Sequence, residues 1–119
     1  MKADLAAVVR RYGKAWAEVD PARRQVALAE IWADDAVYVD PDVPDGAHGR
    51  EALSDLIEAS FATFPGLTIT LTGEVEVLDS RARYRWRATT NDGQSFEGSD
   101  FVEFGADGRI ERVTNFFDS

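Results

Sequence analysis

The second half of the chain alternates apolar and polar residues almost without a break. From Leu67 to Val77 every second residue is apolar, apart from Gly73, and threonine or glutamate fills the positions between. This alternation predicts a strand with one buried face, about 37 Å long at about 3.4 Å per residue, with Gly73 at a bend or bulge. Similar stretches follow at about residues 82–90, 94–104 and 109–117, separated by Asn91-Asp92-Gly93 and Ala106-Asp107-Gly108. Because these tripeptides are turn signals, we expect four long antiparallel strands.

The first half of the chain has helical periodicity instead. Apolar residues at helical spacing predict a first helix over residues 3–19 and a second from Pro21 to about residue 33. They predict a third helix that is marked by apolar residues from Leu53 to Phe64. Between the second and third helices, Ala36 to Asp40 reads as a short strand, and Pro41 to His48 reads as an exposed loop. Helices followed by strands indicate a single α+β domain over residues 1–119, with helices packed on one face of a curved antiparallel sheet.

Composition excludes several kinds of partner and site. The net charge of −9 and the absence of a net positive patch argue against nucleic acid. No apolar run approaches membrane-spanning length, so no membrane association is expected. The chain has no cysteine, and its start, Met1-Lys2-Ala3-Asp4, lacks a hydrophobic signal region. We therefore expect a cytoplasmic protein without disulfides or cysteine-ligated metal.

Three polar residues fall on faces that the pattern assigns to the interior. Asp100 is in phase with Val102 and Phe104 in a predicted strand, Asp40 ends the short strand, and Tyr12 lies in the apolar stripe of the first helix. A carboxyl group in an apolar site is either paired or shifts its pKa upward. If one acid lies near water and the other among aromatic residues, one is ionised and the other protonated at neutral pH, which suits acid–base chemistry. The alternative for Asp100 is a structural acid bonded to its neighbours.

The chain resembles the ketosteroid isomerases of the nuclear transport factor 2-like superfamily, which also contains SnoaL-like polyketide cyclases. The resemblance covers nearly the whole chain in element order and rests on Val8-Val9-Arg10-Arg11-Tyr12, Ala33-Asp34-Asp35-Ala36 leading to Asp40-Pro41, Gly49 opening a helix, and Asp100 followed by Phe104 and Gly108-Arg109-Ile110. It implies a cone-shaped fold in which a curved sheet and three helices enclose a cavity. It also implies homodimers formed through the sheet.

The resemblance further implies the roles of the three polar residues. Asp40 corresponds to the general base, and Tyr12 and a protonated Asp100 correspond to the oxyanion hole. The implied reaction moves a proton next to a carbonyl of a small hydrophobic substrate, without a metal or organic cofactor. Where these isomerases carry further tyrosines behind the oxyanion-hole tyrosine, this chain has Ile57 and Trp32.

Other residues are candidates for binding a ligand in the implied cavity. They are Trp16, Trp32, Tyr38, Phe61, Trp86, Asn115, Phe117 and His48. Most are large aromatic residues that also suit a core, Asn115 places an amide in a wall that is apolar in the isomerases, and His48 is a candidate second acid or base. A cation held by Asp40, Asp42 and Asp45 is disfavoured because prolines interrupt that segment, so no metal site is expected.

Two other functions remain open. One is a SnoaL-like polyketide cyclase or hydrolase that uses the same cavity, with Asp100, Asn115 or His48 moving protons or activating water. The other is a module that binds a small molecule or dimerises without turnover. Phe101, an apolar residue on the otherwise polar outer sheet face, suggests that a second subunit covers part of that face.

Overall fold

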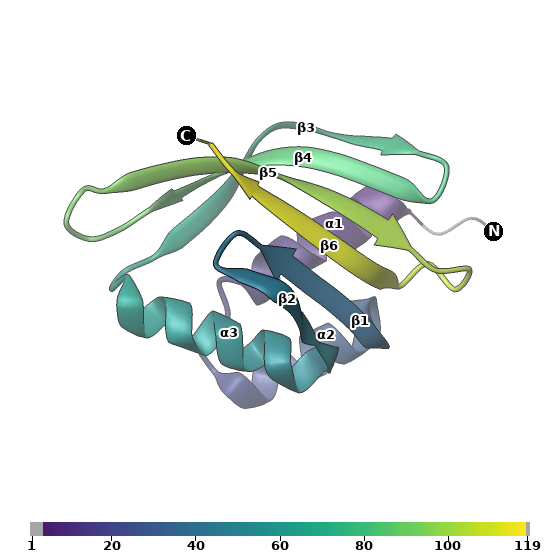
Figure 1. Cartoon of the computed structure of the whole chain (residues 1–119), viewed down its shortest axis with the longest axis horizontal. Coiled ribbons are helices and arrows are strands. Elements are labelled where there is room, and N and C mark those ends of the chain that lie inside the picture. The colour runs from purple at the N-terminus through teal and green to yellow at the C-terminus, as the bar shows by residue number, and fades with distance from the viewer. Residues whose placement is uncertain (1–3, 119) are drawn as a thin grey trace.

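The computed structural model describes residues 4–118, which fold into three helices and one six-stranded sheet. The helices are α1 (Leu5–Ala15), α2 (Pro21–Ile31) and α3 (Gly49–Thr63). The strands are β1 (Trp32–Asp40), β2 (Val43–His48), β3 (Thr68–Leu78), β4 (Arg81–Thr89), β5 (Ser95–Phe104) and β6 (Ile110–Phe117). The sheet has the order β2-β1-β6-β5-β4-β3, and the helices lie on one side of its curved surface (Figure 1). The predicted α+β class is confirmed.

The four predicted C-terminal strands form successive antiparallel pairs, as expected. Gly73 adopts a φ of +88°, and the register between β3 and β4 shifts between Thr72 and Glu76. A positive φ is open to glycine at little cost because it has no Cβ. The predicted irregularity at Gly73 is therefore confirmed.

The segment from Pro41 to His48, expected to be a loop, is mostly a strand, so that prediction was wrong. β2 pairs antiparallel with β1 and lies at the edge of the sheet. An edge strand tolerates Pro44 because one side of its backbone needs no partner strand. β1 also begins earlier than predicted, at Trp32, because it pairs in parallel with β6.

The first helix is shorter than predicted. The backbone N–H groups of Ala17 and Glu18 donate to carbonyls three residues back, at 3.0 and 3.3 Å, so the chain leaves the α-helix in a tight turn after Ala15. Residue 3, where the helix was predicted to begin, lies outside the described residues. The second helix begins as predicted at Pro21, and the Asp20 carboxylate caps it by accepting a hydrogen bond from the Ala22 N–H at 3.0 Å.

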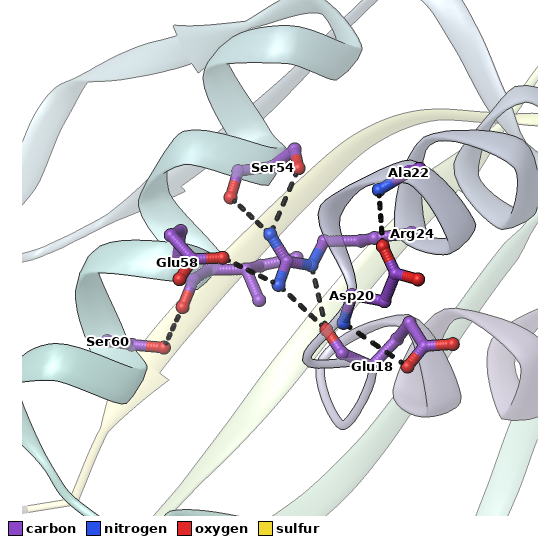
Figure 2. Close-up of polar contacts among 8 residues, drawn as sticks. Glu18, Asp20, Ala22, Arg24, Ser54, Glu58 and Ser60 are labelled. Atoms are coloured by element: carbon purple, nitrogen blue, oxygen red, sulfur yellow. Dashed lines mark hydrogen bonds and ion pairs between the residues drawn. The ribbon is translucent and has the colours of Figure 1, made fainter.

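A buried arginine joins α2 to the segments on either side of it. Arg24 is fully buried and donates to the Glu18 carbonyl at 2.9 and 2.8 Å, to the Ser54 carbonyl and hydroxyl, both at 3.1 Å, and to the Glu58 carboxylate at 3.1 Å (Figure 2). Its guanidinium also lies 5.6 Å from the centroid of the Phe61 ring. All five N–H donors therefore have partners, which fixes α2 against α3.

β4 separates the two faces of the sheet clearly. Its inner side chains are buried, and its outer side chains, four arginines and Thr89, are exposed. Arg83 pairs with Glu76, Arg87 pairs with Glu97, and Arg85 pairs with the acid that follows β6, Asp118. The inner residues, Ala82, Tyr84, Trp86 and Ala88, belong to the core between the sheet and the helices.

Candidate functional site

A cavity of about 1330 Å³ lies between the helices and the inner face of the sheet. Its walls come from α1, α3 and all six strands, and aromatic and aliphatic side chains predominate in them. Tyr12 from α1, Asp40 from β1 and Asp100 from β5 all line this space. The three residues predicted to be catalytic are thus brought to one cavity, which has room for a small organic molecule.

Asp100 lies in an apolar environment, with two hydrogen-bond donors. It is only 6% exposed. Its Oδ2 accepts a hydrogen bond from the Tyr84 hydroxyl at 2.6 Å, and its Oδ1 accepts one from the Trp86 indole N–H at 3.2 Å. Burial raises the pKa of Asp100 to about 7, the two hydrogen bonds oppose this rise, and the charge of Asp40 adds to it. Near neutral pH a substantial fraction of Asp100 is therefore a neutral carboxylic acid.

Tyr12 presents a buried hydroxyl that is unpaired within residues 4–118. Its ring stacks on Trp32, with centroids 5.7 Å apart and planes at 10°. Burial raises the pKa of Tyr12 well above its ordinary value, and the charge of Asp100 raises it further. The indole of Trp16 has a smaller opposite effect without reaching hydrogen-bond geometry. Tyr12 is thus a neutral donor with no acceptor among the described residues, and such a buried group is costly unless a ligand or water pairs with it.

Asp40 is tied to its own hairpin by three donors. Its Oδ1 accepts hydrogen bonds from the backbone N–H groups of Asp42 and Val43, at 2.7 and 2.9 Å. Its Oδ2 accepts one from the Tyr38 hydroxyl at 2.8 Å. These three bonds hold the Asp40 carboxyl group in a fixed orientation at the cavity wall.

Asn115 is the polar residue that connects the two acids. Its carbonyl oxygen lies 3.2 Å from the Trp86 indole nitrogen, and its amide nitrogen donates to the Tyr38 hydroxyl at 2.8 Å. The sheet register accounts for this position, because Asn115 on β6 lies directly opposite Asp100 on β5. Directly opposite residues point to the same face of a sheet.

Trp86 can reach both of these residues because the position opposite it is a glycine. Trp86 pairs with Gly98 across β4 and β5. A Cβ on Gly98 would lie 2.4 Å from the Trp86 ring and 2.2 Å from the Phe116 carbonyl oxygen. The missing side chain therefore leaves space for the indole to lie across β5 toward β6.

Sequence reasoning missed Tyr84 as a site residue. It is buried, lines the cavity and pairs directly with Asp100 in the sheet. Burial raises its pKa well above the ordinary value, and the charge of Asp100 raises it further. The available signal was its place on the inner face of the predicted strand, together with the turn that sets it opposite Asp100.

The predicted ligand-binding residues divide into two groups. Those that line the cavity are Trp16, Tyr38, Trp86, Asn115 and Phe117. Trp32 does not, because it is fully buried beneath Tyr12. Phe61 does not, because its ring turns toward Arg24 on the other side of α3. His48 is exposed, and its ring contacts the Asp45 carbonyl at 3.0 Å, so it lies outside the cavity too.

Among residues 4–118, no three histidine or acidic side chains come together in a way that could hold a metal ion. No helix among these residues has the length and apolarity needed to cross a membrane.

Comparison with known proteins places these observations in a family. The SnoaL-like domain matches residues 9–113. A Steroid Delta-isomerase from Nocardioides simplex is 32% identical over 121 residues, which cover 98% of this chain and 92% of that protein. The crystal structure of a protein of the SnoaL-like family from Agrobacterium tumefaciens has a TM-score of 0.87 and 32% identity, covering 95% of this chain and 96% of that one.

A more distant crystal structure agrees with this fold. A nuclear transport factor 2-like protein of unknown function from Mesorhizobium loti has a TM-score of 0.74 and 31% identity, over 97% of this chain and 91% of that one. The domain match spans most of the sequence and includes Tyr12, Asp40 and Asp100. The chain therefore belongs to the SnoaL-like domain family.

Proposed function

We propose that this protein is a cofactor-independent isomerase that moves a proton next to a carbonyl group of a small hydrophobic compound. The observation that carries the proposal is the placement of two neutral donors, Tyr12 and Asp100, in the same apolar cavity as the carboxylate Asp40. The 32% identity to a Steroid Delta-isomerase supports the same reaction type.

The two donors suit the stabilisation of an enolate. Negative charge would develop on the substrate oxygen when the proton leaves the neighbouring carbon. Tyr12 has a hydroxyl free to donate, and Tyr84 and Trp86 hold the Asp100 carboxyl group in place. Preorganised donors in a site shielded from water stabilise such a charge far better than donors in water.

Asp40 suits the role of base because it is a fixed carboxylate at the cavity wall. It would take the proton from one carbon and return it to another, so that the protein ends the cycle unchanged. The three bonds to Asp40 occupy one position on Oδ2 and two on Oδ1. The remaining position on Oδ2 is the one available to a substrate proton.

The reaction can be tested with a panel of β,γ-unsaturated ketones, including a steroid, in deuterated water. NMR would follow both isomerisation and deuterium incorporation next to the carbonyl. We expect Asp40→Asn to lower the rate by about 10²- to 10⁴-fold and Tyr12→Phe by about 10²- to 10³-fold. Thr114→Val, one residue from Asn115 on the outer face, is the matched control and should keep the wild-type rate.

Binding of a naphthol, which imitates an enolate, separates catalysis from simple binding. The naphthol should bind wild-type protein. Its binding should become weaker with Asp100→Ala or Tyr12→Phe, and tighter with Asp40→Asn because that change removes a negative charge. If none of the three changes alters binding, a module that only binds small molecules or dimerises is favoured. Binding that responds as expected without any exchange would instead point to a cyclase or hydrolase acting in this cavity.

A further inference from the structure

An unbroken series of hydrogen bonds joins the two acids of the cavity. The indole N–H of Trp86 is shared between Asp100 Oδ1 and Asn115 Oδ1, each at 3.2 Å. The Asn115 amide nitrogen donates to Tyr38 Oη at 2.8 Å, and the Tyr38 hydroxyl donates to Asp40 Oδ2 at 2.8 Å. Three uncharged side chains, from β4, β6 and β1, therefore connect one carboxyl group to the other.

Chemistry fixes the direction of each bond in this series. An indole N–H only donates, so the Asn115 atom that faces Trp86 has to be the carbonyl oxygen. The amide nitrogen then faces Tyr38, whose oxygen accepts because an amide N–H also only donates. The Tyr38 proton is left for Asp40, which accepts it as a carboxylate.

We propose that Asn115 is a positioning residue that transmits the protonation state of Asp100 to the hydrogen bond between Tyr38 and Asp40. The shared indole hydrogen is the element that changes. An anionic Asp100 competes with Asn115 for this hydrogen, and a neutral Asp100 competes less strongly. Protonation of Asp100 therefore shifts the Trp86 N–H toward Asn115 and strengthens each following bond, since hydrogen bonds in series polarise one another.

The coupling favours one combination of charges. A neutral Asp100 strengthens the donor at Asp40, and a stronger donor stabilises Asp40 as a carboxylate. Direct repulsion between the two acids acts in the same sense, because the charge of Asp40 raises the pKa of Asp100. The consequence for catalysis rests on the proposed function, whereas the coupling itself is a property of the unliganded protein.

Asp100 is surrounded by a small number of groups that could report its protonation or change it. They are Tyr12 from α1, Tyr38 and Asp40 from β1, Tyr84 and Trp86 from β4, and Asn115 from β6. Apart from the two acids, the titratable members of this set are tyrosines. Burial raises the pKa of each of these tyrosines. These tyrosines therefore stay neutral at the pH at which Asp100 titrates.

NMR can follow the series without substrate. The Trp86 indole N–H reports the end at Asp100, and the Cζ of labelled Tyr38 reports the end at Asp40. In wild-type protein we expect both signals to shift in one step at the pH at which Asp100 titrates, near 7. Asp100→Asn assigns the step, because it should remove the shift from both signals.

Asn115→Leu tests transmission, because leucine has a similar volume and no hydrogen-bonding group. The step should persist at Trp86 and shrink at Tyr38 to the small part that the charge of Asp100 exerts directly. Thr114→Val, the control, should keep both steps. If Tyr38 still shifts in Asn115→Leu by the wild-type amount, the charge of Asp100 acts directly through space and the proposal is overturned.

A second variant covers the case in which Asn115→Leu does not fold. Trp86→Phe removes the indole N–H that joins Asp100 to Asn115. The Cζ signal of labelled Tyr84, whose hydroxyl bonds to Asp100, then reports the protonation of Asp100. The step should remain at Tyr84 and shrink in the same way at Tyr38, and its retention at Tyr38 by the wild-type amount contradicts the proposal. Both measurements are independent of turnover. If wild-type protein shows the pH-dependent shift at Tyr38 but does not catalyse the reaction, only the proposed function is refuted.

Discussion

At the scale of single residues, Asp100 makes the stability of the folded protein depend on pH. Its pKa is about 7 in the folded chain against an ordinary value of 3.8. At a pH below its ordinary pKa of 3.8, Asp100 is protonated in both the folded and the unfolded chain. As the pH rises from about 4 to about 7, the unfolded chain releases the proton and the folded chain keeps it, so the folded state is progressively disfavoured.

Asp100→Asn should remove this dependence, because an amide does not titrate. The free energy of unfolding of the variant, relative to wild type, should rise between pH 4 and pH 7 by up to about 4 kcal/mol and then level off. Urea unfolding of both proteins at a series of pH values measures this difference, in which other titrating groups cancel. Parallel curves for the two proteins would show that Asp100 is ionised throughout.

At the scale of helices and strands, Arg24 makes a large contribution through the bonds that join α2 to α3. Arg24→Met would leave the Ser54 hydroxyl and the Glu18 carbonyl without this donor, whereas the Ser54 carbonyl keeps the backbone N–H of its own helix. We expect a loss of about 2 to 4 kcal/mol in the free energy of unfolding, since each buried unpaired group costs about 1 to 3 kcal/mol.

The neighbouring residue provides the control for this change. The Arg23 side chain is 77% exposed and lies 3.6 Å from Asp20, so Arg23→Met should change stability by less than about 1 kcal/mol. Arg24→Lys keeps the charge but offers fewer donors, and it should fall between the two in denaturant unfolding. Equal midpoints for the Arg23 and Arg24 variants would mean that the buried bonds contribute nothing.

The strand register shows how much of the site the sequence could predict. The turn Asn91-Asp92-Gly93 is centred on residue 92, and strands that fold back symmetrically about it place residue 84 opposite residue 100, as the structure has them. The contact between Tyr84 and Asp100 was therefore within reach of sequence reasoning. The turn at Ala106-Asp107-Gly108 is centred on residue 107, which by the same logic would place residue 114 opposite Asp100.

An irregularity in the ladder changes that second pairing. The register shifts between Glu103 and Phe104, so that Asn115 rather than residue 114 lies opposite Asp100. Alternation alone places Asn115 on the inner face, but its contacts depend on this one-residue shift. The series of hydrogen bonds from Trp86 to Asp40 could not be predicted either. It depends on this register shift and also on the parallel pairing of β1 with β6.

At the scale of the whole molecule, the order of helices and strands was sufficient to predict the layers but not the edge of the sheet. Three helices before four alternating strands leave few arrangements other than helices packed on one sheet face. β2 carries proline and glycine, and it forms a strand because β1 offers a free edge next to it. That partner is set by the tertiary structure, which no local pattern encodes.

The outer sheet face carries the last prediction, that two copies of the chain associate there. Phe101 and Phe116 are 36% and 57% exposed on adjacent strands, in a face whose other side chains on β4, β5 and β6 are charged or carry hydroxyl groups. Burying both rings against a second copy would remove apolar surface from water, and the family resemblance implies the same surface. Sedimentation should therefore give a dimer for wild type and a monomer for the double variant Phe101→Asp, Phe116→Asp. Val26→Asp, at a 66% exposed position on α2, should remain a dimer, and a wild-type monomer at all concentrations would exclude this association.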